Sequence, residues 1–222
     1  MRTFILIPGA GGVAWYWHRV VPLLAAAGHD AVAVDLPGDD DQAGLPEYAS
    51  IVTAAIGERR DVVLVAQSLG GFTAPMVAAE IPVSGRVFVN AMIPLPGETP
   101  SAWSGTTGSG PARAKAAAAG GYSEDFDDVT YFLHDVPAEV RADGEGRQRP
   151  ESEAVFSSVC EFPGWPRVPI KVVAGQDDRL FPAGFQAAVA RERLGIDADV
   201  LPGGHLIALA QPEALARYLL DF

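Results

Sequence analysis

Three side-chain types that together can carry out acyl transfer each follow a predicted strand: a serine, an aspartate and a histidine. Ser68 stands in DVVLVAQSLGGFTAP, after the apolar run Val62–Ala66 and before Gly70 and Gly71. A buried strand, a tight turn with a serine and the start of a helix are the parts of a nucleophile elbow. The usual pattern is G-x-S-x-G, and here Ala66 takes the first place. Ser68 is therefore a candidate nucleophile, with an ordinary helix N-cap as the alternative.

The candidate base and its partner come later in the chain. His205 directly follows two glycines in LPGGHLIAL, and Asp177 and Asp178 stand together in AGQDDRLFP. A histidine can take the serine proton while a carboxylate fixes the imidazole tautomer. The pattern G-x-x-D-x-x-x-P, which ends at Pro182, favours Asp178 as that carboxylate. Asp177 is the alternative and is otherwise expected to be a turn residue.

Acyl transfer also requires N–H donors for the oxyanion. The backbone amide of Leu69 is one candidate, and that of Ala10, in the glycine cluster Gly9–Gly12, is the other. This cluster, with Asp35 at the end of the second predicted strand, is also compatible with a dinucleotide site. We do not favour that alternative. Ala14 stands where G-x-G-x-x-G has its third glycine, and a dinucleotide site leaves the later serine, aspartate and histidine unexplained.

An alternating β/α framework is needed to bring these residues together. Apolar runs predict six strands, at Phe4–Ile7, Ala31–Asp35, Val62–Ala66, Arg86–Ala91, Pro169–Ala174 and Ala198–Leu201. Helices are predicted between and after them, at about Ala14–Ala27, Glu47–Glu58, Phe72–Glu80, Phe181–Leu194 and Gln211–Leu220. The pattern predicts an α/β fold with a mostly parallel six-stranded sheet and helices on both faces. Such sheets bind ligands beyond the carboxyl ends of their strands, where the candidate loops lie.

The alternation stops between the fourth and fifth strands, in a stretch rich in Pro, Gly, Ser and charged residues. We interpret 94–166 as an insertion that forms a small, mostly helical lid. The chain 1–222 is then a single domain, with a core of 1–93 and 167–222. His134, in the lid, is expected to be a satisfied structural histidine. Trp15 and Trp17 are expected to pack in the core or on the surface, with a place for one of them in the pocket wall as the alternative.

The composition argues against several classes of function. A formal net charge of −12 disfavours nucleic-acid and membrane partners, which require a basic face. A single cysteine, Cys160, leaves no internal disulfide and no cysteine-based metal cluster. No stretch approaches about 18 apolar residues, and the N-terminal apolar run is short for a signal peptide, so a cytoplasmic protein is expected. We expect a small-molecule substrate and neither a metal nor an organic cofactor.

The sequence resembles the α/β-hydrolase superfamily along its length, and within it the branch of plant methylesterases and hydroxynitrile lyases. FILIPGAGGVAWYWHRVVPLLAAAGHDAVAVDLPG is similar to the opening of that branch, VVLVAQSLGGFTAP to its elbow and GGH to its C-terminal part. The resemblance implies Ser68 as the nucleophile, His205 as the base and Asp178 as the orienting carboxylate. It implies the amides of Ala10 and Leu69 as the oxyanion donors. It is nearly absent in the predicted lid.

Differences from the branch bear on the reaction. Its lyases depend on a lysine after the catalytic histidine and a threonine in the first loop, where this chain has Leu206 and Gly9. Hydroxynitrile cleavage is therefore not expected, and a serine nucleophile argues against epoxide or haloalkane hydrolysis. We expect hydrolysis of a carboxylic ester or related acyl bond through an acyl-enzyme. The alternatives are a non-hydrolytic or C–C bond-cleaving enzyme of the same fold, and a ligand-binding protein with slow turnover.

Overall fold

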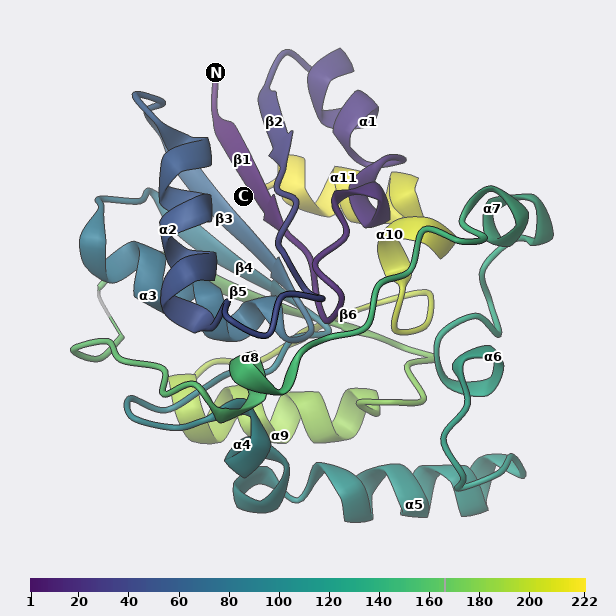
Figure 1. Cartoon of the computed structure of the whole chain (residues 1–222). Helices are drawn as coiled ribbons and strands as arrows, with labels where there is room; N and C mark the ends of the chain where they lie inside the picture. The colour runs from purple at the N-terminus through teal and green to yellow at the C-terminus, as the bar shows by residue number, and fades with distance from the viewer. Residues whose placement is uncertain (166) are drawn as a thin grey trace.

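The computed structural model describes residues 1–165 and 167–222 (Figure 1). Six strands form one sheet in the order β2-β1-β3-β4-β5-β6, and each neighbouring pair runs parallel. The strands are β1 Thr3–Ile7, β2 Asp30–Ala33, β3 Val62–Gln67, β4 Gly85–Val89, β5 Ile170–Gly175 and β6 Asp199–Leu201. The predicted parallel six-stranded fold is confirmed, and the strand ends lie within two residues of the predicted ones.

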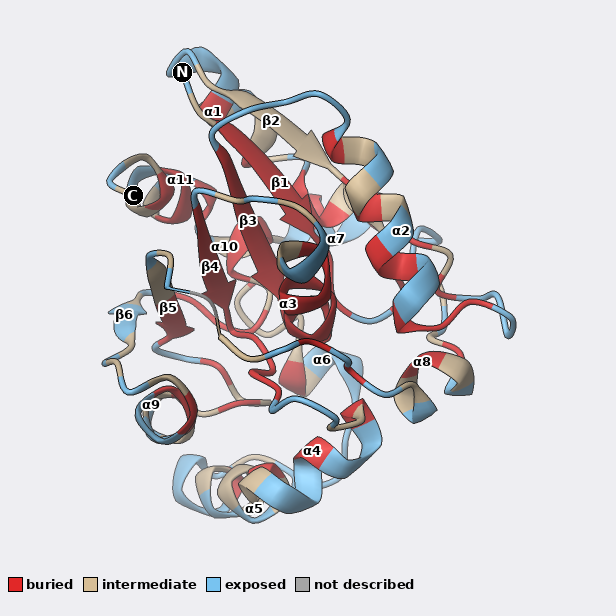
Figure 2. Cartoon of the chain, turned by 90° about the vertical axis from the view of Figure 1, so that its left-hand side faces the viewer, coloured by how far each residue is buried: buried red, intermediate tan, exposed pale blue. Residues whose placement is uncertain are grey.

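Helices cover both faces of the sheet, because successive side chains of each strand point to opposite faces. The covering elements are η1 Ala14–Trp17, α1 Val21–Ala26, α2 Leu45–Ile56, α3 Gly70–Glu80, α9 Ala183–Leu194, α10 Ile207–Ala210 and α11 Pro212–Leu220. Ile5 and Leu64 pack in the core under α2, α3 and α9. Their neighbours Phe4 and Val63 pack against η1, α1, α10 and α11. The central strands are therefore buried on both sides, as Figure 2 shows.

The single helix predicted over 14–27 is wrong. The segment forms the 3-10 turn η1 and then the short helix α1, with 18–20 between them. Pro22 lies in the first turn of α1, where its missing N–H costs no intrahelical hydrogen bond. In a continuous helix the same proline would remove a bond and clash with the preceding turn, so the helix begins anew at this point. Gly28, with a φ of 86°, follows the helix end as expected.

The segment 94–165 connects β4 to β5, and most of it lies beyond the carboxyl ends of the strands (Figures 1 and 2). Its helices are α4 Pro100–Thr107, α5 Ser109–Gly120, α6 Asp128–Tyr131, α7 Ala138–Asp143 and α8 Glu153–Ser157. Pro166, the last residue of the predicted lid, lies outside the described residues. Within the described ranges, no helix combines the length and the apolar character needed to cross a bilayer.

Candidate active site

Ser68 occupies the tight turn between β3 and α3. Its backbone has a φ of 50°, in the left-handed region that residues other than glycine rarely adopt. The turn is held by the Met92 N–H, which donates to the Ser68 carbonyl at 3.0 Å. The two glycines after it allow a close approach of neighbouring chain. A Cβ on Gly70 would lie 2.5 Å from the Pro8 carbonyl oxygen, and one on Gly71 would overlap the Met92 carbonyl.

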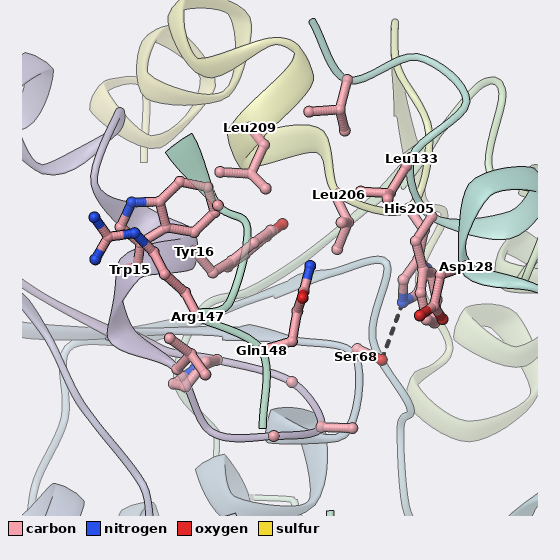
Figure 3. A pocket seen from close by; sticks show the side chains of 18 of the residues that line it. Trp15, Tyr16, Ser68, Asp128, Leu133, Arg147, Gln148, His205, Leu206 and Leu209 are labelled. Carbon is pink, nitrogen blue, oxygen red and sulfur yellow. Dashed lines mark hydrogen bonds between the residues drawn. The ribbon is translucent and has the colours of Figure 1, made fainter. Parts of the chain in front are cut away.

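Three side chains from separate loops form a continuous hydrogen-bonded chain. Ser68 Oγ lies 3.0 Å from His205 Nε2, as Figure 3 shows, and His205 Nδ1 lies 2.8 Å from Asp178 Oδ2. An ionised carboxylate only accepts hydrogen bonds, so Nδ1 carries the proton and Nε2 is free to accept from the serine hydroxyl. His205 is 1% exposed and Asp178 is 4% exposed. The structure thus brings together residues from the loops after β3, β5 and β6.

Geometry distinguishes the two neighbouring aspartates. The second oxygen of Asp178, Oδ1, accepts the N–H groups of Leu180 and Phe181 at 2.8 and 2.9 Å. Asp177 is exposed, and its backbone N–H donates to the Gly203 carbonyl. Asp178 therefore faces the imidazole, while Asp177 takes part in the turn.

Two aromatic rings and a carboxylate lie around the histidine loop, and the Phe132 ring and the Asp135 carboxylate come from the 94–165 segment. The rings of Phe132 and Phe181 lie 5.2 and 5.3 Å from the His205 ring, measured between centroids. Asp135 Oδ2 accepts the Gly204 N–H at 2.5 Å, directly before the histidine. The adjacent His134 departs from expectation. Its Nε2 is buried and has no hydrogen-bond partner among the described residues.

The two expected oxyanion donors belong to the loop after β1 and to the turn of Ser68 itself. Ala10 lines a cavity next to Ser68. Leu69 directly follows Ser68, is 3% exposed and is the N-cap of α3, whose positive dipole end favours a developing negative charge. The loop of Ala10 is held in place by hydrogen bonds at the next two residues. Gly11 N–H donates to the Glu151 carboxylate, and the Gly12 carbonyl accepts from Leu36 N–H.

Glu151 is a site residue that the sequence did not reveal. Its carboxylate accepts from Gly11 N–H and from the Tyr48 hydroxyl, both at 2.6 Å. Burial raises the pKa of Glu151, and burial together with the hydrogen bond to Glu151 raises the pKa of Tyr48. The partners lie 140 and 103 residues away in the chain, so no local pattern could have indicated the contact.

A cavity of about 300 Å³ opens beside Ser68 and His205. Much of its wall is apolar and comes from both the core and the 94–165 segment, as Figure 3 shows in part: Trp15, Tyr16, Leu133, Val136, Val140, Leu206 and Leu209. Asp128, Arg147 and Gln148 add polar groups.

The position of Trp15 corrects an expectation. The side chain lines the cavity, stacks on the ring of His18 and donates from Nε1 to Asp143 at 3.2 Å. Only Trp17 packs in the core, where it is completely buried. Residues two positions apart point to different sides of a 3-10 turn, as they do in an α-helix, so one indole faces the core and the other faces the cavity.

Residues 4–218 match the family described as "Alpha/beta hydrolase family". The chain belongs to the alpha/beta hydrolase family. It is 38% identical over 111 residues to "Probable esterase PIR7A" of Oryza sativa subsp. indica, a match that covers 44% of this chain and 41% of that protein. It is 24% identical over 250 residues to "Norfluorocurarine synthase 1" of a Strychnos species, covering 98% of this chain and 94% of the relative.

Two solved structures have the same fold as this chain. Polyneuridine aldehyde esterase superposes with a TM-score of 0.78 at 21% identity, covering 100% of this chain and 98% of the other. A pyrethroid hydrolase from Sphingobium faniae JZ-2 gives a TM-score of 0.76 at 24% identity, with coverages of 100% and 96%. The resemblance to the plant methylesterase branch is confirmed, and the match with the rice esterase spans less than half of that relative's length.

Proposed function

We propose that this alpha/beta hydrolase is a serine hydrolase that cleaves a carboxylic ester or related acyl bond of a small molecule. The observation that carries the proposal is the hydrogen-bonded chain Ser68–His205–Asp178 at the wall of a cavity. The relatives named as esterases support an ester as the bond that is cleaved.

In the proposed acylation step, the Ser68 hydroxyl attacks the ester carbonyl carbon while His205 Nε2 accepts its proton. Asp178 stays ionised and stabilises the imidazolium. The carbonyl oxygen becomes negative and accepts hydrogen bonds from the N–H groups of Ala10 and Leu69. The carbon–oxygen bond to the alcohol then breaks, and His205 returns its proton to the leaving oxygen. This step leaves an acyl group on Ser68.

Water completes the proposed cycle. It gives a proton to His205 Nε2 as its oxygen attacks the acyl carbon, and the bond to Ser68 Oγ breaks with return of that proton. The products are the carboxylic acid and the free enzyme. The apolar lining contributed by Trp15, Val140 and Leu209 supports an apolar group on the substrate.

A fluorophosphonate probe tests the nucleophile directly. The intact-mass spectrum of the protein should gain one phosphonyl adduct, and Ser68→Ala should gain none. An adduct that persists in Ser68→Ala would contradict the proposal. A panel of p-nitrophenyl esters with acyl groups of increasing size then measures hydrolysis.

The neighbouring aspartates provide a matched pair of variants. Asp178→Asn should lower kcat about 10³- to 10⁴-fold, because the imidazole then lacks its orienting anion. Asp177→Asn removes the same charge from an exposed turn and should leave kcat within about twofold of the native value, as expected for a surface change. Equal losses in the two variants would overturn the role given to Asp178.

A non-hydrolytic reaction by the same residues is the second candidate, because a relative aligned over 98% of this chain is named a synthase. The two candidates differ in the fate of an activated ester. A hydrolase shows an initial burst of p-nitrophenol and then steady turnover. Adduct formation with the fluorophosphonate but no turnover of any ester in the panel would favour the second candidate.

A further inference from the structure

Two buried amide side chains, Asn90 and Gln186, lie behind the Ser68–His205–Asp178 chain. Asn90 directly follows β4 and is completely buried, and Gln186, in α9, is 3% exposed. Neither lines the cavity beside Ser68. They therefore cannot contact a substrate there, and any effect on the reaction must pass through other residues.

Asn90 connects the two loops that carry the histidine and the aspartate. Its Nδ2 donates to the carbonyl oxygens of Gly204 and His205 at 2.9 and 3.1 Å. Its Oδ1 accepts the N–H of Gly175, at the end of β5, at 2.6 Å. The backbone of Asn90 has a φ of 47°, a conformation that asparagine tolerates better than most residues. One side chain thus fixes the loops after β5 and β6 relative to each other.

The nitrogen of Gln186 reaches the oxygen of Asp178 that binds the histidine. Its Nε2 lies 3.1 Å from Asp178 Oδ2, 3.2 Å from Asn90 Oδ1 and 2.6 Å from the Phe181 carbonyl. All three neighbours of this atom are hydrogen-bond acceptors, so the NH₂ group of Gln186 must face them and the amide oxygen must point away. Its Oε1 is buried without a partner in the described part of the chain. Such an unsatisfied acceptor is destabilising, so its presence calls for an explanation.

The explanation lies in the hydrogen bonds of Asp178. Oδ1 accepts two backbone N–H groups, and Oδ2 accepts from His205 Nδ1 and Gln186 Nε2. Without Gln186, Oδ2 keeps the imidazole as its only donor, and the carboxylate can turn about its bond to Cβ. We propose that Gln186, oriented by Asn90, is a positioning residue that sets the plane of the Asp178 carboxylate and thereby the His205 ring. The inference rests on the proposed chemistry of Ser68.

The proposal predicts a particular kinetic effect. Since the amides touch no substrate, their loss should lower kcat and kcat/KM together and leave KM unchanged. A misplacement of a proton-transfer group by a fraction of an ångström should cost about tenfold in kcat.

The test compares Gln186→Met with Val189→Ala. Methionine has a similar length and no donor, whereas Val189, 5% exposed in the same helix, is an apolar side chain of the core without a hydrogen-bonding group. Gln186→Met should lower kcat and the rate of fluorophosphonate labelling about tenfold. Val189→Ala should lower the melting temperature and leave both rates at the native values. Unchanged kcat in Gln186→Met, or equal loss of kcat in the two variants, would overturn the proposal.

A spectroscopic measurement separates this inference from the proposed function. The proton between an imidazole nitrogen and a carboxylate resonates far downfield, and no substrate is needed to observe it. In Gln186→Met the resonance of His205 Nδ1–H should move or broaden, while Val189→Ala keeps it. An unchanged resonance refutes the positioning role. If Ser68→Ala still forms an adduct with the probe, the proposed function fails, whatever the resonance shows.

Asn90→Asp provides a second variant, should Gln186→Met not fold. Aspartate has the same shape and tolerates the left-handed backbone, but it presents an oxygen to the carbonyls of Gly204 and His205. The same loss of kcat at constant KM is expected. A native kcat in this variant would overturn the role of Asn90.

Discussion

The sheet and the 94–165 segment are held in place by different kinds of interaction. In the sheet, the side chains of β1, β3 and β4 are at most 4% exposed, and apart from Thr3, Gln67 and Arg86 they are apolar or glycine. These strands pack on helices from both sides, so the loops at their carboxyl ends are fixed by the apolar core. Ser68 owes its position to this packing.

The 94–165 segment adds Trp103 and Val155 to one apolar cluster and Val136 and Val140 to the other, and it also contacts the rest of the protein through buried carboxylates. The Glu98 carboxylate pairs with Arg193 of α9 at 2.5 Å, and both side chains are at most 7% exposed. Two further carboxylates, those of Asp135 and Glu151, accept backbone N–H groups from loops of the core.

Apolar packing is non-directional and independent of pH, whereas a carboxylate contact depends on geometry and protonation. We infer that the apolar core fixes Ser68 and that the buried carboxylates help to hold the 94–165 segment against the core. Three predictions test whether the two regions can be disturbed separately.

The largest effect is expected in the sheet. Phe88→Ala leaves a cavity under α3 and α9 and should lower the free energy of unfolding by about 3–5 kcal/mol. Phe126→Ala, in the segment, removes a ring that is 49% exposed and should lower it by less than about 1 kcal/mol. Urea unfolding curves measure both. Similar losses in the two variants would mean that the segment is packed as the core is.

An intermediate effect is expected at the buried ion pair. Arg193→Met leaves Glu98 buried without its charge partner and should lower the free energy of unfolding by about 3 kcal/mol. Limited proteolysis should then cut the 94–165 segment first. Adding Glu98→Gln removes the unpaired charge and should restore much of the stability. If the double variant is as unstable as Arg193→Met, the loss comes from packing, which would contradict the role given to the Glu98–Arg193 ion pair.

The smallest effect is expected in the pH dependence of stability, to which Glu98 and Glu151 should contribute with opposite signs. Burial opposes ionisation of Glu98, but hydrogen bonds from Arg193, Thr106 and Leu95 N–H outweigh it and lower its pKa. Its contribution to stability is present above the pKa of the unfolded chain and is lost as the pH falls through the lower folded pKa. Burial raises the pKa of Glu151, so stability declines as the pH rises from the unfolded to the folded pKa.

Unfolding curves between about pH 2 and pH 8 of the native chain, Glu98→Gln and Glu151→Gln measure the two contributions, because that of Glu98 changes below the ordinary pKa of a glutamate and that of Glu151 above it. Glu98→Gln should remove a contribution to the free energy of unfolding that increases with pH. Glu151→Gln should remove a contribution that decreases with pH. The same sign of change in both variants would contradict the assigned causes.

Local patterns in the sequence were sufficient for the strands and the three loops. A buried parallel strand is a short apolar run that needs no knowledge of its neighbours, so the predicted strand ends were close to the observed ones. The prediction of one helix over 14–27 is wrong because a 3-10 turn followed by an α-helix has nearly the same apolar periodicity as one continuous helix. Pro22 fixes the start of α1, because a proline is tolerated in the first turn of a helix and not further inside it.

By itself, the sequence determined the α/β framework and the loops that carry Ser68, Asp178 and His205. Strand propensity and turn chemistry are local, and parallel strands place their carboxyl ends at one edge. The pattern that ends at Pro182 favoured Asp178 over Asp177, but only the tertiary structure decided between them, because it buries Asp178 against the imidazole and leaves Asp177 exposed in the turn. The tertiary structure also decided the contacts of Glu151 and Gln186. A hydrogen bond between residues about a hundred positions apart depends on how the elements pack, which no local pattern encodes.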